Sequence, residues 1–588
     1  MAVGSRPLGR SRPWASPRGP QTRPDLPRLR VLWLAVTALL LATAIWGRLA
    51  YWQVAQHGHL TQLATEQHLT EVPLPASRGL IYDREMRPLA INTTVYDVTL
   101  APDLVRADER ERVADSLSSI LGVPRDEVIG KLAAKTKFAY VAKRQSKDKA
   151  DQLSRLRLPG VYLQALEQRS YLPGGTGDLS LASSMLGFVD YQGNGQRGVE
   201  AYYNKQLSGR DGFLSTYRDL AGRELMLSGE TRRDPVNGAA MVLTMDSNVQ
   251  FAAEQAVAAG VKAAKAESGS VLVMDTKTGG IVASATYPAY DGNQFATADP
   301  TRTRDPVISD LYEPGSVMKV VTLSGALDAG KITPQTTIED PGYVSVGGSV
   351  IHDWDLKSHG TVTMTNVLEK SLNVGAIKAM QMEGRDSYFH YLEGFGFGAS
   401  SGIDVANEAN MSLRPATQWR DSEVATASFG QGIAANMVQM CAAVNVVANQ
   451  GRWVQPHVVQ SIGGASPGTF ASRQVVSPQT AATMTQMMDS VVQHGSGYMA
   501  RVKGFELDQA GKTGTSQIPE NGKYSPDHVW ASYVGFMPAD NPRFTMLVVV
   551  RKPNNGSADH NEGYYVSAPI WKAVAEQTVL DWRISPGG

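Results

Sequence analysis

One apolar run near the N-terminus constrains this chain more than any other feature. Residues 31–52 carry a single charge, Arg48, and Val31–Trp46 carries none. About 20 apolar residues are enough for a helix to cross a bilayer. The far end of the run holds residues that suit a membrane interface: the rings of Trp46, Tyr51 and Trp52, and Arg48, whose long side chain can reach the headgroups. The sequence therefore predicts a transmembrane anchor over residues 31–52.

The residues before this run predict its orientation. Residues 1–30 hold seven arginines and six prolines but only one acid, Asp25. A segment so polar and so rich in proline cannot bury a core, so we expect a disordered tail. Arginines flank the cytoplasmic side of a span, which places the N-terminus in the cytoplasm and the other 530 or so residues outside the cytoplasmic membrane.

The alternative to an anchor is a cleaved signal peptide. Ala42-Thr43-Ala44 matches the small-residue pattern of a cleavage site. The apolar and aromatic character continues beyond this point to Trp52, which favours a retained anchor.

Composition limits the chemistry of the large segment that follows. Lysine plus arginine and aspartate plus glutamate number 56 each, so the overall charge gives no argument for binding nucleic acid. The single cysteine, Cys441, excludes an intrachain disulfide or a thiolate metal cluster. The histidines of this segment are spread without metal-ligand spacing, among them His352, His359, His494 and His528. The sequence implies neither a metal nor an organic cofactor.

The 588 residues are enough for more than one domain. We expect a pedestal domain at residues 53–235, with a polar helical stalk at 53–71 and a charged helical region at 107–155. A second domain is expected at residues 236–588. Its expected elements are a helix at 248–265, a hairpin at 270–285, three late strands (508–516, 529–536, 544–550) and a last helix from Pro569. Strands at both ends with helices between them indicate an antiparallel sheet with segregated helices, an α+β fold.

A serine followed by a lysine three residues later gives the first chemical signal. Pro314-Gly315 turns the chain, Ser316-Val317-Met318-Lys319 follows, and an apolar helical run comes next. Residues three apart share one face of a helix, so the Lys319 amine faces the Ser316 hydroxyl. A lysine in apolar surroundings loses its charge readily, and a neutral amine can take a proton from serine. Ser316 is thus the candidate nucleophile and Lys319 its base.

Two later elements strengthen this prediction. Ser371-Leu372-Asn373 offers a second hydroxyl and an amide in a loop, and Lys512-Thr513-Gly514-Thr515 places a cation and two hydroxyls on a predicted strand. Ser-x-x-Lys alone is weak, since Ser146–Lys149 repeats it in a highly charged stretch. Residues 277–279 repeat Lys-Thr-Gly but fit a hairpin turn.

In this order, the three elements resemble those of the penicillin-recognising serine transferases and β-lactamases. Further segments are similar to motifs of the class B penicillin-binding proteins: Arg78–Arg84, Arg169–Gly174, Gly198–Glu200, Phe429–Gly432 and Ala531–Phe536. Within that class the chain is most similar to the division-type FtsI transpeptidase, with the elongation type as runner-up. Two positions depart from the division type: Leu372, where serine is common, and residues 565–567, where a glycine pair is common.

The resemblance implies a fold and an activity. The fold would be a penicillin-binding/β-lactamase-like transpeptidase domain on an elongated, dimerisation-like pedestal, in which Arg78 pairs with Glu200. The activity would be peptidoglycan D,D-transpeptidation through an acyl-enzyme on Ser316 during septal wall synthesis. The substrate would be a stem peptide ending in D-Ala-D-Ala, and β-lactams would acylate the same serine. Expected partners are an FtsW-like glycosyltransferase and other divisome membrane proteins.

The resemblance also implies roles for the remaining site residues. Ser371 relays a proton to the leaving amine, and Asn373 holds Lys319 and the substrate. Lys512 supplies positive charge, and Gly514 lets the substrate lie close. Thr513 and Thr515 offer hydroxyls to the substrate carboxylate, and the backbone N–H groups of Ser316 and Thr515 form the oxyanion hole.

The residues leave three alternatives open. The first is an elongation-type transpeptidase. The second is a hydrolase of the D,D-carboxypeptidase or β-lactamase kind, and the third is a penicillin-binding sensor.

Overall fold

The computed structural model describes residues 26–60, 69–177, 179–218, 224–225, 231–506, 508–556 and 558–586. It divides into two units. The first comprises Met1–Leu74 and Phe213–Arg233, and the second comprises Pro75–Gly212 and Asp234–Gly588. Most of the tail predicted to be disordered, residues 1–25, lies outside the described residues.

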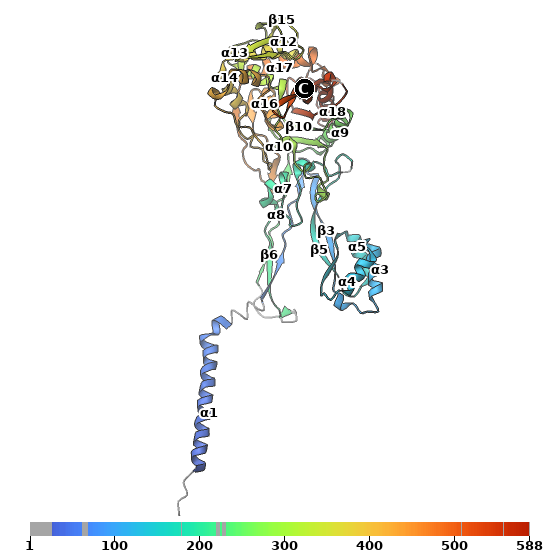
Figure 1. Cartoon of the computed structure of the whole chain (residues 1–588), viewed down its shortest axis with the longest axis vertical. Helices are drawn as coiled ribbons and strands as arrows, with labels where there is room; N and C mark the ends of the chain where they lie inside the picture. Colours follow the sequence, from blue (N-terminus) through green and yellow to red (C-terminus); the bar gives the residue numbers. More distant parts are fainter. Residues whose placement is uncertain are drawn as a thin grey trace, which may run out of the picture. The chain divides into compact units, whose positions relative to one another are not determined.

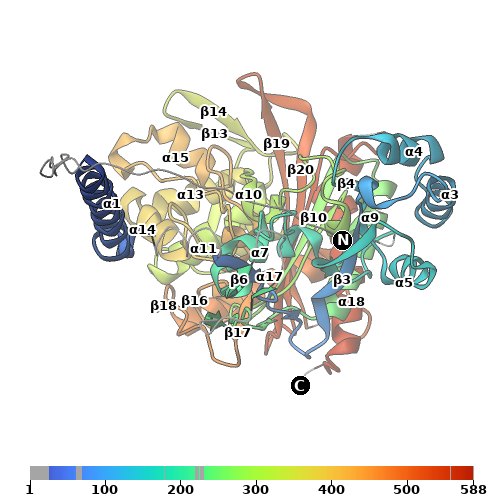
Figure 2. The ribbon, with the colours of Figure 1, turned by 90° about the horizontal axis from the view of Figure 1, so that it is seen from below.

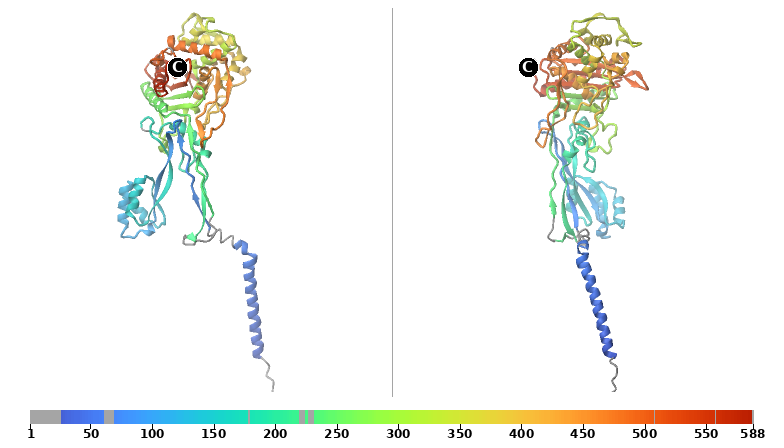
Figure 3. Two further views of the ribbon diagram at one scale, coloured as in Figure 1. Left: turned by 180° about the vertical axis from the view of Figure 1, so that it is seen from behind. Right: turned by 90° about the vertical axis from the view of Figure 1, so that its left-hand side faces the viewer.

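The first unit begins with the long apolar helix α1 (Leu26–Ala50), which continues into a short π-helix, η1 (Tyr51–Ala55). Figure 3 shows α1 as one continuous helix. It starts five residues before the predicted span. Proline is tolerated in the first turn of a helix, so Pro27 does not prevent this early start. Within the described residues, one helix is long and apolar enough to cross a membrane, Leu29–Ala55. Arg48 lies over the Trp52 ring, 5.0 Å from its centroid.

A small sheet completes the first unit. It contains β1 (Leu69–Leu74), β6 (Gly212–Arg218), β7 (Glu224–Leu225) and β8 (Thr231–Arg233), with β6 paired to the other three. The prediction of a helical stalk over residues 53–71 is therefore wrong at its C-terminal end, where β1 begins. Residues 61–68 of that stalk lie outside the described residues.

The second unit contains a sheet built largely from pedestal residues. Its order is β17 (Val459–Ile462), β9 (Met241–Leu243), β2 (Ile81–Tyr82), β3 (Pro88–Leu100) and β4 (Ala139–Gln145), and β5 (Val161–Tyr171) also pairs with β3. Strands β9 and β17 lie beyond residue 236 yet extend this sheet, so the two predicted domains share it. The domain boundary at residue 236 stays a prediction.

Three helices pack on the far end of β3–β5: α3 (Arg110–Leu121), α4 (Arg125–Ala133) and α5 (Lys147–Leu156). Their buried residues, such as Val113, Leu117 and Leu132, form a separate hydrophobic cluster. The prediction that residues 107–155 are helical is wrong for β4, which lies between α4 and α5. The strand was missed because its segment, Ala139–Gln145, carries two cations and no continuous apolar face.

A buried ion cluster joins the pedestal motifs. Glu200, which is fully buried, pairs with Arg78 (2.6 Å) and with Arg169 (2.7 Å) and accepts a hydrogen bond from the Tyr171 hydroxyl (3.2 Å). The predicted pairing of Arg78 with Glu200 is confirmed. Three segments far apart in sequence therefore meet at one carboxylate.

The central sheet of the second unit is antiparallel, in the order β11 (Ile281–Tyr287), β10 (Ser268–Asp275), β21 (Phe544–Arg551), β20 (Lys523–Met537) and β19 (Ala510–Glu520). Its alternating residues divide between two cores. On β21, for example, Met546 and Val548 belong to one cluster and Leu547 and Val549 to the other. Figure 2 shows β19 and β20 as a long hairpin.

Helices cover both faces of this sheet (Figure 1). On one face lie α9 (Ser247–Ala263) and α18 (Gly563–Asp581), with Trp571 fully buried. The other core includes α11 (Lys319–Asp328), α16 (Met437–Ala448) and α17 (Pro478–His494). The predicted α+β fold with segregated helices is confirmed. The last helix starts six residues before the predicted Pro569, which instead lies inside α18.

Smaller elements connect these layers. The helices are α6 (Ser183–Leu186), α7 (Gly198–Tyr202), α8 (Asn204–Ser208), α10 (Pro306–Ser309), α12 (Met364–Glu369), α13 (Asn373–Glu383), α14 (Arg385–Phe395) and α15 (Asp421–Ala427). The strand pairs are β12 (Thr337–Asp340) with β15 (Gly360–Thr363), β13 (Tyr343–Val346) with β14 (Ser349–His352), and β16 (Arg452–Val454) with β18 (Ser472–Gln474).

Candidate active site

The Ser316 turn is held in place by close backbone packing. Ser316 lies in a 3₁₀ turn, Gly315–Met318, that leads directly into α11. Gly315 has φ +60 and donates its N–H to the Gly430 carbonyl (3.0 Å). A Cβ on Gly430 would lie 2.2 Å from the Gly315 oxygen, so only glycine fits there. The Phe429–Gly432 motif thus acts as a backbone support for the candidate nucleophile.

Lys319 is fully buried, and its amine contacts Ser316, Ser371 and Asn373. Its Nζ lies 3.0 Å from Ser316 Oγ, 2.5 Å from the Ser371 carbonyl oxygen and 2.9 Å from Asn373 Oδ1. Burial lowers the pKa of Lys319 well below its ordinary value, and the neighbouring Lys512 lowers it further. The lowered pKa favours the neutral amine, which is the form that can accept a proton from Ser316.

A neutral amine has two N–H donors and one lone pair. The Ser371 carbonyl and Asn373 Oδ1 can only accept, so they take the two N–H groups. In this neutral form the lone pair is left facing the Ser316 hydroxyl, whose Oγ lies 3.0 Å from Nζ. This arrangement suits removal of the Ser316 proton.

Ser371 occupies a tight turn between α12 and α13. Its φ is +59, an uncommon conformation for a residue other than glycine, and such strain is concentrated at functional sites. The turn directs the Ser371 hydroxyl between two amines, 2.9 Å from Lys512 Nζ and 3.3 Å from Lys319 Nζ. Leu372, the departure from the division-type pattern, is fully buried beneath the turn.

Lys512, Thr513, Gly514 and Thr515 lie on β19, the edge strand of the central sheet. Burial lowers the pKa of Lys512 to about 7, and its Nζ donates to the Thr513 carbonyl oxygen (2.9 Å). A Cβ on Gly514 would meet Ser532 Oγ at 2.4 Å and Val317 Cγ2 at 2.8 Å, so glycine lets β19 approach the Ser316 turn. An edge strand has backbone groups free to pair with an extended peptide.

The structure thus brings together all five predicted catalytic residues and sets β19 alongside them. Thr515 is exposed, and its hydroxyl accepts from the Gly563 N–H (3.3 Å) at the start of α18. Sequence reasoning missed Ser496, whose hydroxyl lies 2.7 Å from Thr513 Oγ1. It also missed Asp353, which contacts the start of α13. The one signal for Ser496 was its position between two glycines immediately after a helix.

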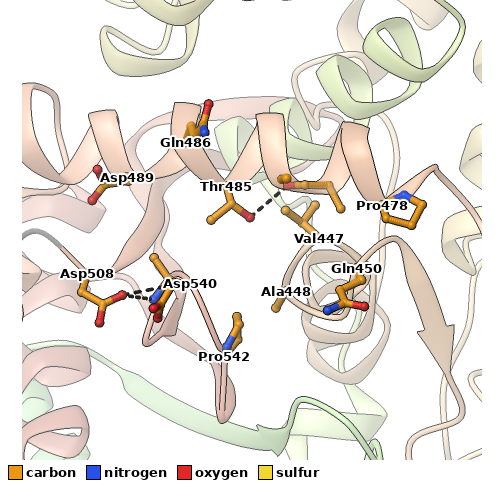
Figure 4. Close-up of a pocket in the computed structure, with 13 residues that line it drawn as sticks. Val447, Ala448, Gln450, Pro478, Thr485, Gln486, Asp489, Asp508, Asp540 and Pro542 are labelled. Atoms are coloured by element: carbon orange, nitrogen blue, oxygen red, sulfur yellow. Dashed lines mark hydrogen bonds between the residues drawn. The ribbon is translucent and has the colours of Figure 1, made fainter. Parts of the chain in front are cut away.

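A separate cavity of about 580 Å³ lies beyond this cluster (Figure 4). Its walls come from the end of α16, the first turns of α17 and the turn between β20 and β21. Thr485, Asp489 and Asp540 are among its lining residues. None of the predicted site residues lines it, so it is distinct from the candidate active site.

Two family models match the chain. The model described as Penicillin binding protein transpeptidase domain matches residues 269–576, and the model described as Penicillin-binding Protein dimerisation domain matches residues 73–243. Together they account for the site, the central sheet and the pedestal.

Individual proteins are similar along most of their length. Stage V sporulation protein D of Bacillus subtilis is 30% identical over 573 residues, covering 95% of this chain and 86% of the relative. Peptidoglycan D,D-transpeptidase FtsI of Escherichia coli is 29% identical over 559 residues, covering 93% of this chain and 91% of the relative. A crystal structure of penicillin binding protein 3 from Mycobacterium tuberculosis, complexed with ampicillin, has 27% identity and a TM-score of 0.67, covering 88% of this chain and 98% of that chain.

Proposed function

Since this chain belongs to the class B penicillin-binding proteins and is a peptidoglycan D,D-transpeptidase, we propose that Ser316 is its acylated nucleophile. We further propose that it cross-links stem peptides of the septal wall during cell division. The observation that carries the site assignment is the contact set of Lys319, whose two acceptor neighbours leave its lone pair for the Ser316 hydroxyl (3.0 Å).

In the proposed first step, Ser316 Oγ attacks the carbonyl carbon between the two terminal D-alanines, and Lys319 takes the Ser316 proton. The backbone N–H groups of Ser316 and Thr515 bind the oxyanion, an interaction typically worth about 10²–10³ in rate per donor. The C–N bond then breaks. Ser371, placed between two amines, passes a proton to the departing D-alanine amine and is reprotonated from Lys319.

In the second step, an amine of another stem peptide attacks the acyl-enzyme, loses its proton to the same relay and releases Ser316. Before the first step, Lys512 and the hydroxyls of Thr513 and Thr515 bind the carboxylate of the terminal D-alanine, while Gly514 lets the substrate lie against β19. A β-lactam acylates Ser316 in the same way, and its ring C–N bond breaks. Its amine stays tethered to the acyl group, so the acyl-enzyme persists.

The septal role rests on similarity to FtsI of Escherichia coli and on the spacing of the three motifs, because the separations of 55 residues from Ser316 to Ser371 and 141 from Ser371 to Lys512 suit the division type. Stage V sporulation protein D, of comparable identity, is named for sporulation. We propose that α1 anchors the chain with its N-terminus in the cytoplasm, because five of the seven arginines precede it and the other two, Arg28 and Arg30, lie at its start, before the apolar run. The transpeptidase then lies outside, with an FtsW-like glycosyltransferase as partner. The experiment for the septal role is depletion in cells, where filaments are expected and swollen or rounded cells would support the elongation type instead.

A labelled β-lactam and intact mass measurement test the nucleophile. The wild type and Ser146→Ala, which removes the serine of the second Ser-x-x-Lys, should both gain one stable adduct. Ser316→Ala should gain none. A stable adduct that forms equally on Ser316→Ala would refute the assignment.

A second measurement separates transfer from hydrolysis. With a D-Ala-D-Ala substrate and a supplied acceptor amine, a transpeptidase releases D-alanine together with cross-linked product. Release of D-alanine with no cross-linked product at any acceptor concentration would support a carboxypeptidase instead.

A further inference from the structure

The end of strand β14 and the residue after it hold the start of α13 by three hydrogen bonds, two of them from Asn373. Asp353 Oδ1 accepts from the N–H groups of Asn373 (2.5 Å) and Val374 (3.0 Å), the first residues of α13. The His352 carbonyl accepts from Asn373 Nδ2 (3.0 Å). Because the amide nitrogen is committed to His352, Oδ1 of the same side chain must face Lys319, which lies 2.9 Å away.

Asp353 is itself held against a second carboxyl group. Asp340, at the end of β12, faces it, and both residues are almost fully buried. Among the described residues, Oδ2 of Asp353 and Oδ2 of Asp340 have no other hydrogen-bond partner. The remaining oxygen of Asp340 accepts from the Gly342 N–H (2.8 Å). A proton shared by the two Oδ2 atoms would satisfy both.

The titration of Asp353 fits this arrangement. Burial, with the facing Asp340 adding to it, raises the pKa of Asp353 to about 6. Two charged groups interact with it, Asp340 on β12 and Lys319 on α11, and His352 on β14 precedes it in the chain. The pair of Asp355 with His359 (3.3 Å) lies on the following loop.

We propose that Asp353, held by the facing carboxyl group of Asp340, is a positioning residue for acylation that orients Asn373 and the Ser371 turn on Lys319. The proposal rests on the assignment of Ser316 and Lys319 above. When Lys319 takes the Ser316 proton it becomes an ammonium, and the Asp353 charge, acting beyond Asn373, favours that form. Asp353 therefore orients the base and also stabilises the charge that develops on it.

The test uses the full-length protein in detergent and a fluorescent penicillin. The rate constant of acylation per active molecule is measured from pH 5 to pH 9, with the thermal midpoint of each variant alongside. The variants are Asp353→Ala, Asp353→Asn, Asp340→Asn and, as the matched control, Asp355→Asn from the same loop.

Asp353→Ala removes the acceptor that fixes Asn373, so we expect a loss of about 10²-fold, the cost of a misplaced catalytic group. Asp353→Asn keeps an acceptor oxygen but loses the charge, so its rate should fall between wild type and Asp353→Ala, and the limb of the profile near pH 6 should vanish. In Asp340→Asn the amide can donate to Asp353, so the rate should stay within about threefold while that limb moves to lower pH. Asp355→Asn should match wild type.

A merely structural role would lower the thermal midpoint and the active fraction but leave the rate and the pH profile of the surviving molecules unchanged. That result would overturn the proposal. If Asp353→Ala does not fold, the pH profile of acylation by Asp353→Asn tests the proposal alone. His352 is unchanged in that variant, so loss of the limb near pH 6 could not be attributed to His352. An adduct located away from Ser316 in the wild type would instead refute the proposed function itself.

Discussion

Replacing Glu200 with glutamine should destabilise the second unit strongly. Glu200 is the shared partner of two guanidinium groups whose side chains are 9% (Arg78) and 4% (Arg169) exposed. Glutamine keeps the shape of the side chain but leaves both cations without a counter-charge in a dry environment. Breaking a buried pair in this way typically costs about 3–5 kcal/mol.

The two arginines differ in how much support they keep. Arg78 still donates to the Gly193 and Glu200 carbonyls and to Asn204. Arg169 keeps only Asn92 among its hydrogen bonds, and its Nη2 already lacks a partner among the described residues. Most of the loss in unfolding free energy should therefore come from Arg169, and it should lie in the upper part of the range of about 3–5 kcal/mol.

Thermal unfolding followed by tryptophan fluorescence measures the effect. The expected fall in the midpoint is on the order of 10 °C, and acylation of the molecules still folded at 25 °C should remain near normal. Glu85→Gln is the control, because Glu85 is 60% exposed and lies 3.4 Å from Arg87, an ion pair worth less than about 1 kcal/mol. A loss for Glu200→Gln no larger than that of the control would refute the reasoning.

Three further outcomes follow from the site and the core. Because the pKa of Lys512 is about 7, raising the pH from 6 to 8.5 removes its charge, and the KM for a carboxylate-bearing substrate should rise several-fold. An equal rise for a neutral amide analogue would contradict the role of Lys512 in binding the carboxylate. Gly514→Ala forces its Cβ against Val317 Cγ2 (2.8 Å), so acylation of fluorescent penicillin should fall at least about tenfold with about 1–3 kcal/mol of stability lost; wild-type acylation would show that β19 can move away freely. Tyr203→Phe removes the 2.7 Å hydrogen bond to Asp404 and should cost about 1 kcal/mol in denaturant unfolding, and an unchanged midpoint would count against that bond.

How much of this site the sequence predicts depends on how far apart along the chain the contacting residues lie. Ser316 and Lys319 are three residues apart, so local helical geometry is enough to bring them together. The positions of Ser371 and Lys512 could be predicted through the resemblance, but the φ of +59 at Ser371 could not, since nothing about serine favours it. Asp353 escaped prediction because its partners, Asn373 and Val374, are 20 and 21 residues away on another element.

The fold shows the same division. Strands β10 and β21 and the second half of β20 were expected because their apolar residues are continuous and both faces are largely buried, whereas the polar first half of β20 was not expected. Strand β4 was missed because its pattern is weak and its pairing with β3 is long-range. The start of α18 was misplaced because proline usually marks a first turn, whereas Pro569 sits several residues inside the helix.

The strand order of the central sheet has a consequence for the timing of synthesis. Strand β10 pairs along its whole length with β21, so that Ser268 lies opposite Arg551. A growing chain therefore carries β10 and β11 with an unpaired apolar edge from the end of β11 at Tyr287 until β21 is complete at Arg551, a state prone to aggregation. Lys512 also arrives late, so a ribosome-bound chain that already contains Ser316 should be unreactive towards penicillin until synthesis is almost complete.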